Sequence, residues 1–109
     1  MGYFEDDYIV RAVRHFAQIV ANLVSNRRGA HGDTHTLEEI EDAYGELFGF
    51  PRGLLDALDV ATVAGMVQSP ERLASLIELL DADATIAAAA GDAARAERRQ
   101  RLADGLRAR

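Results

Sequence analysis

Residues 31–35, with the sequence HGDTH, hold the side chains whose types and spacing come closest to a chemical site. His31, Asp33 and His35 occupy every second position of this segment. Two neutral imidazoles and a carboxylate suit Zn²⁺, and alternate residues converge on one ion in a tight loop. The alternative is a solvated loop in which Asp33 and Thr34 make local turn hydrogen bonds. Because the remaining histidine, His15, falls on a predicted helix far away in sequence, we favour the plain loop and expect no bound metal or cofactor.

No other segment has a pattern typical of catalysis. The chain has no cysteine, which excludes thiolate metal sites and thiol nucleophiles. It has no GxSxG motif, no phosphate-binding glycine loop and no dinucleotide fingerprint. Two carboxylate pairs, Glu38 with Asp42 and Asp81 with Asp83, are expected on solvated helix faces, whereas acid–base catalysis needs a buried or charge-coupled carboxyl group. The sequence therefore predicts a protein that is not an enzyme.

The composition predicts a small folded domain. The 109 residues, of which 49% are hydrophobic and 28% charged, suffice for one core, so we expect a single domain over 1–109. The net charge of −6 argues against general nucleic-acid binding. No apolar run is long enough to span a membrane, and the first residues are acidic where a signal peptide is basic, so we expect a cytoplasmic protein. All 12 basic residues are arginine and alanine is the commonest residue, which indicates a GC-rich bacterial genome.

A long helix is predicted over about residues 5–27. Its apolar residues recur at spacings of four and three, as in a short heptad seam. The seam consists of Ile9, Val13, Phe16, Val20 and Leu23. The apolar face spans roughly 220°, about twice the stripe that a surface helix needs. This helix is therefore expected either to form the centre of the bundle or to share one flank with a second subunit in a homodimer.

The rest of the chain predicts shorter helices and no strand. A glycine-rich loop covers about residues 28–36. Thr36 and Glu39 have the spacing of a capping box, which places a helix start at about Leu37. Short helices follow to about residue 67, one of them opened by Pro51. Ser69, followed by a proline, marks the start of a helical hairpin over about 70–107. The prediction is an all-α bundle of five to six helices.

The hairpin segment LDADATIAAAAGDAARAERRQRLADGL, residues 80–106, resembles a tetratricopeptide repeat unit. Such a unit packs two antiparallel helices through small residues at their crossing. The small residues that match are Ala84, Ala96 and Ala103. Gly91 and Asp92 match the turn, whereas Leu80 and Ala87 stand where the family often has large aromatic residues. The resemblance implies a helical hairpin, and a single unit does not form the peptide-binding groove of longer arrays.

The opening EDDYIVRAVRHFAQIVANLV, followed by an acidic helix, SPERL and the hairpin, is similar to a family of small uncharacterised bacterial proteins. That resemblance implies no activity. Charge is uneven along the chain: residues 33–59 hold eight acids and one arginine, and residues 92–109 hold six arginines and three acids. We expect these arginines either to lie on a solvated terminal helix or to pair with the acidic segment of the same or a second chain.

The sequence therefore favours a non-catalytic interaction module, expected as a homodimer or with another protein partner. Two alternatives remain, a small metal-binding protein that uses the loop at His31 and a nucleic-acid binder that uses the arginine-rich C-terminal helix.

Overall fold

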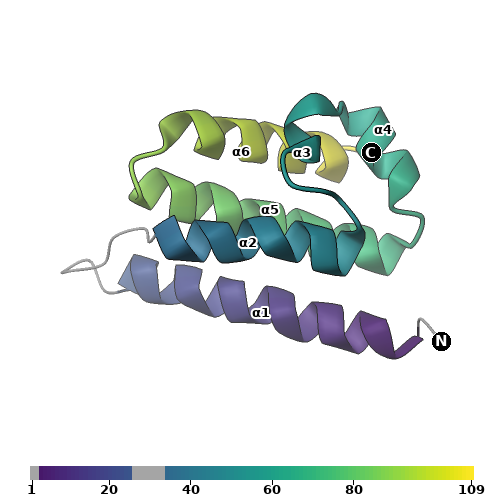
Figure 1. The fold of residues 1–109 in the computed structure, drawn as a ribbon, viewed down its shortest axis with the longest axis horizontal. Coiled ribbons are helices and arrows are strands. Elements are labelled where there is room, and N and C mark those ends of the chain that lie inside the picture. Colours follow the sequence, from purple (N-terminus) through teal and green to yellow (C-terminus); the bar gives the residue numbers. More distant parts are fainter. Residues whose placement is uncertain (1–2, 26–33) are drawn as a thin grey trace.

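The computed structural model describes residues 3–25 and 34–109 and confirms an all-α architecture (Figure 1). These ranges contain six helices and no strand. The helices are α1 (Tyr3–Ser25), α2 (Thr34–Phe48), α3 (Leu54–Ala57), α4 (Val60–Met66), α5 (Pro70–Ala89) and α6 (Ala93–Arg107). None of the described helices combines the length and the apolar character needed to cross a membrane.

Helix α5 forms the centre of the bundle. It packs against α6, α1 and α2, whereas α1 packs mainly against α5 alone. In Figure 1, α1 and α5 run in one direction, α2 and α6 run in the other, and α1 lies at the outer edge. The interpretation that α1 occupies the centre is therefore wrong. The buried positions of α5 extend around roughly 200° of its circumference at the usual 100° per residue, so this helix is covered by three neighbours.

Capping residues define the helix boundaries in the C-terminal half of the chain, and those at Ser69 and Gly91 were predicted. The carboxylate of Asp59 accepts a hydrogen bond from the Thr62 backbone N–H at 2.8 Å, and α4 begins at the next residue. The Ser69 hydroxyl accepts from the Arg72 N–H at 3.3 Å, with Pro70 in the first turn of α5. Gly91 adopts the left-handed conformation that closes the hairpin, with φ of 87°. Asp59 and Ser69 thus satisfy backbone N–H groups that a helix N-terminus leaves unpaired.

Two predicted helix starts between residues 34 and 58 are wrong. Helix α2 begins at Thr34, so Thr36 lies buried inside the first turn and does not cap the helix. Pro51 lies outside α3, and its carbonyl accepts a turn hydrogen bond from the Leu54 N–H at 3.0 Å. Gly53 explains the later start of α3, because its φ of 83° is incompatible with a continuous helix from Pro51.

The contact between α4 and α6 depends on the absence of a side chain at Gly105. A Cβ atom at this position would lie 2.6 Å from Cγ2 of Val60, closer than van der Waals contact allows. We expect Gly105→Ala to lower the free energy of unfolding by about 1 kcal/mol, because overpacking outweighs the gain in helix propensity. Urea denaturation monitored by circular dichroism measures the change.

Gly65→Ala in α4 is the matched control for this substitution. A Cβ atom at Gly65 meets no atom within 4 Å, so only the propensity gain of about 0.5–1 kcal/mol applies and we expect stabilisation. If both glycine variants are stabilised equally, the helices α4 and α6 do not approach as closely as described.

Candidate functional site

The predicted metal loop is only partly within the described residues. His31 and Asp33 lie outside them. His35 lies in the first turn of α2 with an exposed side chain, and its Nε2 is 3.9 Å from Oε1 of Glu39. Over residues 3–25 and 34–109, no group of three or more histidine, aspartate or glutamate side chains is arranged to hold a metal ion. The described structure therefore places one of the three candidate ligands, and it places that one on the helix surface.

The predicted seam of α1 lies against the core of the same chain. Ile9, Val13 and Phe16 are buried, and Val20 and Leu23 are half-buried against the core. These five residues pack on α5 and its neighbours without a second subunit. Any interface formed by α1 must therefore use the flanks of the helix and not the seam.

The three alanines predicted to pack the hairpin lie between α5 and α6, which form the most extensive helix pair of the structure. Ala84 and Ala103 are buried, and Ala96 is half-buried. Small side chains at these positions let the two helix backbones approach closely. The hairpin geometry follows from this stripe together with the turn at Gly91.

Three arginines of α6 pair with the acidic segment of the same chain, which is one of the arrangements expected from the sequence. Nη1 of Arg95 is 2.9 Å from Oε1 of Glu41, and Nη1 of Arg99 is 2.8 Å from Oδ1 of Asp56. Nε of Arg98 is 3.2 Å from the same Asp56 oxygen. Three of the arginines that a nucleic-acid interface on α6 would require are therefore engaged by carboxylates within the chain.

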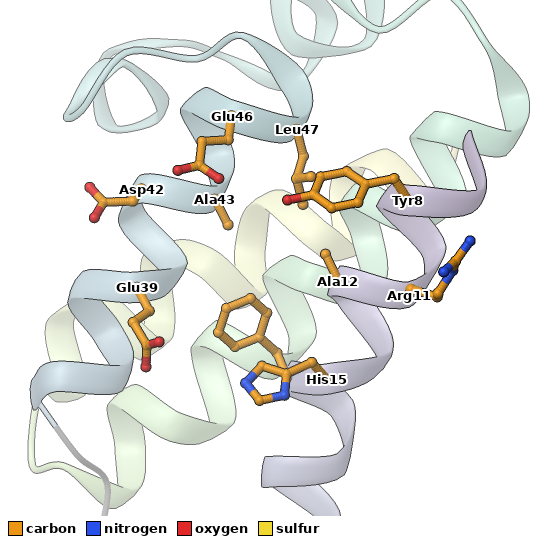
Figure 2. A pocket seen from close by; sticks show the side chains of 10 residues that line it. Tyr8, Arg11, Ala12, His15, Glu39, Asp42, Ala43, Glu46 and Leu47 are labelled. Carbon is orange, nitrogen blue, oxygen red and sulfur yellow. The ribbon is translucent and has the colours of Figure 1, made fainter. Parts of the chain in front are cut away.

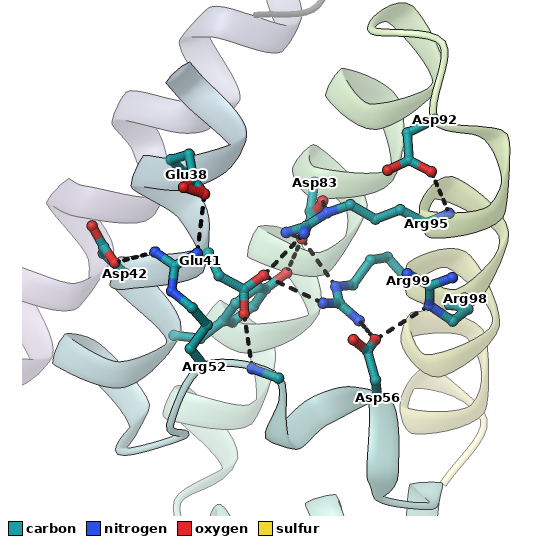
Figure 3. Close-up of polar contacts among 12 residues, drawn as sticks. Glu38, Glu41, Asp42, Arg52, Asp56, Asp83, Asp92, Arg95, Arg98 and Arg99 are labelled. Carbon is teal, nitrogen blue, oxygen red and sulfur yellow. Dashed lines mark hydrogen bonds and ion pairs between the residues drawn. The ribbon is translucent and has the colours of Figure 1, made fainter. Parts of the chain in front are cut away.

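Asp83 of α5 organises these arginines from inside the protein (Figure 3). It was predicted to lie on a solvated face, and that prediction is wrong because its exposed fraction is 0%. Nε and Nη2 of Arg95 donate to its two oxygens at 2.7 and 2.8 Å. Nε of Arg99 donates at 3.1 Å, and the Tyr44 hydroxyl donates at 2.6 Å. Four charge-assisted hydrogen bonds thus compensate the burial of this carboxylate.

We call this group the Asp83 cluster. Its members come from α2, α3, α5 and α6. They are Glu41, Tyr44, Asp56, Asp83, Arg95 and Arg99. Glu41 also accepts from the backbone N–H of Gly53 at 3.3 Å, which attaches the start of α3. The guanidinium of Arg99 lies 5.5 Å from the centre of the Tyr44 ring. The cluster therefore joins four helices around one buried carboxylate.

The centre of the Asp83 cluster is buried. Asp83, Tyr44 and Arg99 are each no more than 1% exposed. Burial disfavours a charged Arg95, but its hydrogen bonds and its attraction to Asp83 outweigh that effect and raise the pKa of Arg95. Burial, together with the negative charge of Asp83, raises the pKa of the Tyr44 hydroxyl well above its usual value of 10.

The raised pKa of the Tyr44 hydroxyl predicts that the protein loses stability at alkaline pH. Below about pH 10 the folded and unfolded chains both hold this proton, and above it only the unfolded chain releases it. We expect this group to remove up to about 1.4 kcal/mol of stability for each pH unit above 10. Denaturation curves between neutral pH and pH 11 measure the loss.

Tyr44→Phe should be less stable at neutral pH but should lose this part of the alkaline slope. Tyr8→Phe is the matched control, because Tyr8 is 56% exposed and should keep the slope of the unmodified chain. An unchanged alkaline slope in Tyr44→Phe would contradict a buried, protonated Tyr44.

A groove runs between α1 and α2 on the surface of the bundle (Figure 2). Its volume is about 580 Å³. Phe16 and Ala12 of α1 and Ala43 and Leu47 of α2 form an apolar floor. Tyr8 extends its ring from α1 toward α2, over the end of this floor. The lining of the groove therefore combines apolar and charged side chains.

The two walls of this groove have opposite charge. The α1 side carries Arg11 and His15, and the α2 side carries Glu39, Asp42 and Glu46. Asp42 is paired with Arg52 at 2.8 Å. Within the described part of the chain, neither Arg11 nor Glu46 forms an ion pair. This groove was not predicted from the sequence, because it depends on how α1 and α2 both pack against α5.

Comparisons with known proteins found no match to the chain among family models, curated proteins or solved structures.

Proposed function

We propose that this protein is a non-catalytic interaction module that forms a homodimer through the outer surface of α1. The observation that carries the proposal is the distribution of exposed apolar side chains. Of the four large hydrophobic residues exposed among the described side chains, Tyr8, Val10 and Val24 belong to α1 and only Met66 does not. Single exposed apolar residues are ordinary, whereas their concentration on one outer helix is typical of an interaction surface.

The position of α1 supports this proposal. The helix lies at the edge of the bundle and packs mainly on α5, so both of its flanks are open. Its flank toward the groove carries Tyr8, and its opposite flank carries Val10 and Val24, which are 37% and 66% exposed. We further propose that the hairpin of α5 and α6 is a TPR-like support that holds α1 in place, and the buried Ala84 and Ala103 support this role.

The absolute mass in solution tests the proposal. Light scattering on a sizing column, at micromolar to millimolar concentrations, should give twice the chain mass of 11.9 kDa. The measurement is repeated with added zinc to separate self-association from metal-induced assembly. A mass of one chain at every concentration, with and without zinc, would overturn the homodimer.

A further inference from the structure

We propose that the homodimer forms through the groove between α1 and α2, with α1 of each copy lying over α2 of the other around a two-fold axis parallel to the helices. This inference rests on the proposed self-association and specifies its surface. The occupant of the groove is a second copy of this chain, and the four helices form an antiparallel bundle. Charge, register and area each support this arrangement.

Charge complementarity selects the helix that faces α1. On the groove side of α1 the charged side chain is that of Arg11, and His15 also lines this side. On the groove side of α2 the charged side chains are acidic, Glu39, Asp42 and Glu46. Placing α1 over the partner's α1 would bring like charges together, whereas placing it over the partner's α2 brings opposite charges together. The second arrangement is therefore favoured, because like charges across an interface select against a pairing.

The alignment of α1 with α2 along the helix axes within one chain determines which residues of two chains face each other in the dimer. The groove sides of α1 and α2 carry Tyr8 near Leu47 at one end and His15 near Glu39 at the other (Figure 2). A two-fold rotation about an axis parallel to the helices preserves positions along that axis. It therefore places Arg11 of one copy over the stretch of the other copy from Asp42 to Glu46. The helices α1 and α2 of the two copies then alternate in direction, as in an antiparallel four-helix bundle.

The acidic side chains of α2 are electrostatically stabilised by such a partner. Glu39, Asp42 and Glu46 are spaced by three and four residues, so they lie on one face of the helix and repel one another. Glu46 has no ion pair within residues 3–25 and 34–109, and neither has Arg11. In the dimer the partner's Arg11 approaches these acids twice, once on each side of the axis. The symmetric contact therefore neutralises charges that a single copy leaves unpaired.

The available area is sufficient for a small specific dimer. At 1.5 Å per residue, α1 and α2 are about 34 and 22 Å long. Two helices side by side are roughly 20 Å wide, so this face offers about 500 Å² per copy and about 1,000 Å² in total. That area lies at the lower limit for specific interfaces, and we expect a dissociation constant in the micromolar range.

A charge exchange between two variants tests the arrangement. Arg11→Glu places an acid over the partner's acids, and Glu46→Arg places a base over the partner's Arg11. Each variant alone should fold normally and dissociate at about tenfold higher concentration than the unmodified chain, because two symmetric surface contacts become repulsive. An equimolar mixture of the two variants should form a heterodimer with the original affinity, since the introduced glutamate of one copy then faces the introduced arginine of the other. Sedimentation equilibrium, with one variant fluorescently labelled, measures all three constants.

The control separates this inference from the broader proposal, because Val10 and Val24 lie on the opposite flank of α1 and mark the competing surface for self-association. If the groove is the interface, Val24→Asp should leave the dissociation constant unchanged. If Val24→Asp breaks the dimer and the charge variants do not, self-association stands and the groove is not its surface. If the charge variants weaken the dimer but their mixture does not recover, the proposed pairing of α1 with the partner's α2 is wrong. A monomeric unmodified chain would overturn the inference together with the homodimer.

Discussion

Asp83→Ala is expected to remove about 3–5 kcal/mol of the free energy of unfolding, because it leaves Arg95 and Arg99 inside the protein without their shared carboxylate. The total stability of a small domain is about 5–15 kcal/mol, so this single substitution brings the chain close to unfolding. Urea denaturation followed by circular dichroism at neutral pH gives the change.

Asp81→Ala is the matched control for this experiment. Asp81 lies two residues earlier in α5, is partly exposed, and pairs with Arg107 at the protein surface. Its removal should cost less than about 1 kcal/mol, as is usual for a surface ion pair. Equal losses in the two variants would show that burial of Asp83 does not determine its contribution.

Val13→Glu should abolish cooperative folding. Val13 is 0% exposed in its own chain, so the new carboxylate would be buried among apolar residues without a partner, at a cost of several kcal/mol. Val20→Asp should be less damaging because Val20 is only half-buried. Circular dichroism and a thermal scan measure the effect on each variant.

Val24→Glu on the same helix is the control, because Val24 is 66% exposed and should leave the fold intact. The contrast also determines how association is tested. Substitutions in the seam of α1 report on folding, and only substitutions on its flanks report on dimerisation. A Val13→Glu variant that remained fully folded would contradict the packing of α1 against α5.

Local signals in the sequence predicted the helices that have strong caps. The ends of α5 and α6 fall within about two residues of their predicted positions, because Ser69 and Gly91 mark them. The start of α2 was misplaced because the capping-box spacing of Thr36 and Glu39 occurs inside the helix, which already begins at Thr34. Helix α3 is shorter than predicted because Gly53 has a positive φ. A glycine allows this conformation but does not require it, so the sequence did not reveal it.

Part of the Asp83 cluster was detectable in the sequence. Asp83 follows Leu76 and Leu80 at spacings of seven and three, so it belongs to the apolar stripe of α5. Arg99 belongs in the same way to the stripe of α6, four residues before Ala103. An acid and a base in facing stripes of one hairpin predict a buried ion pair.

The contributions of Glu41 and Asp56 to this cluster could not be predicted in the same way. These acids reach the arginines only after α2 and α3 have packed on the hairpin, and no local periodicity encodes that placement. The groove between α1 and α2 is unpredictable for the same reason. The width of the apolar arc on α1 did indicate an unusual helix, but it did not distinguish a central position from an edge position with two open flanks.

The outer position of α1 also orders events during synthesis of the chain. Helix α5 begins 45 residues after α1 ends, so at about 5–20 residues per second α1 waits roughly 3–13 s for all of α5 to be translated. During that time the side chains of Ile9, Val13 and Phe16 have no native surface to cover them. The hairpin of α5 and α6, in contrast, closes across a short turn and folds as soon as α6 emerges. Helix α2, which also packs on α5, ends nearer to α5 in the sequence, so of these two helices α1 has the apolar face that waits longer for its packing partner.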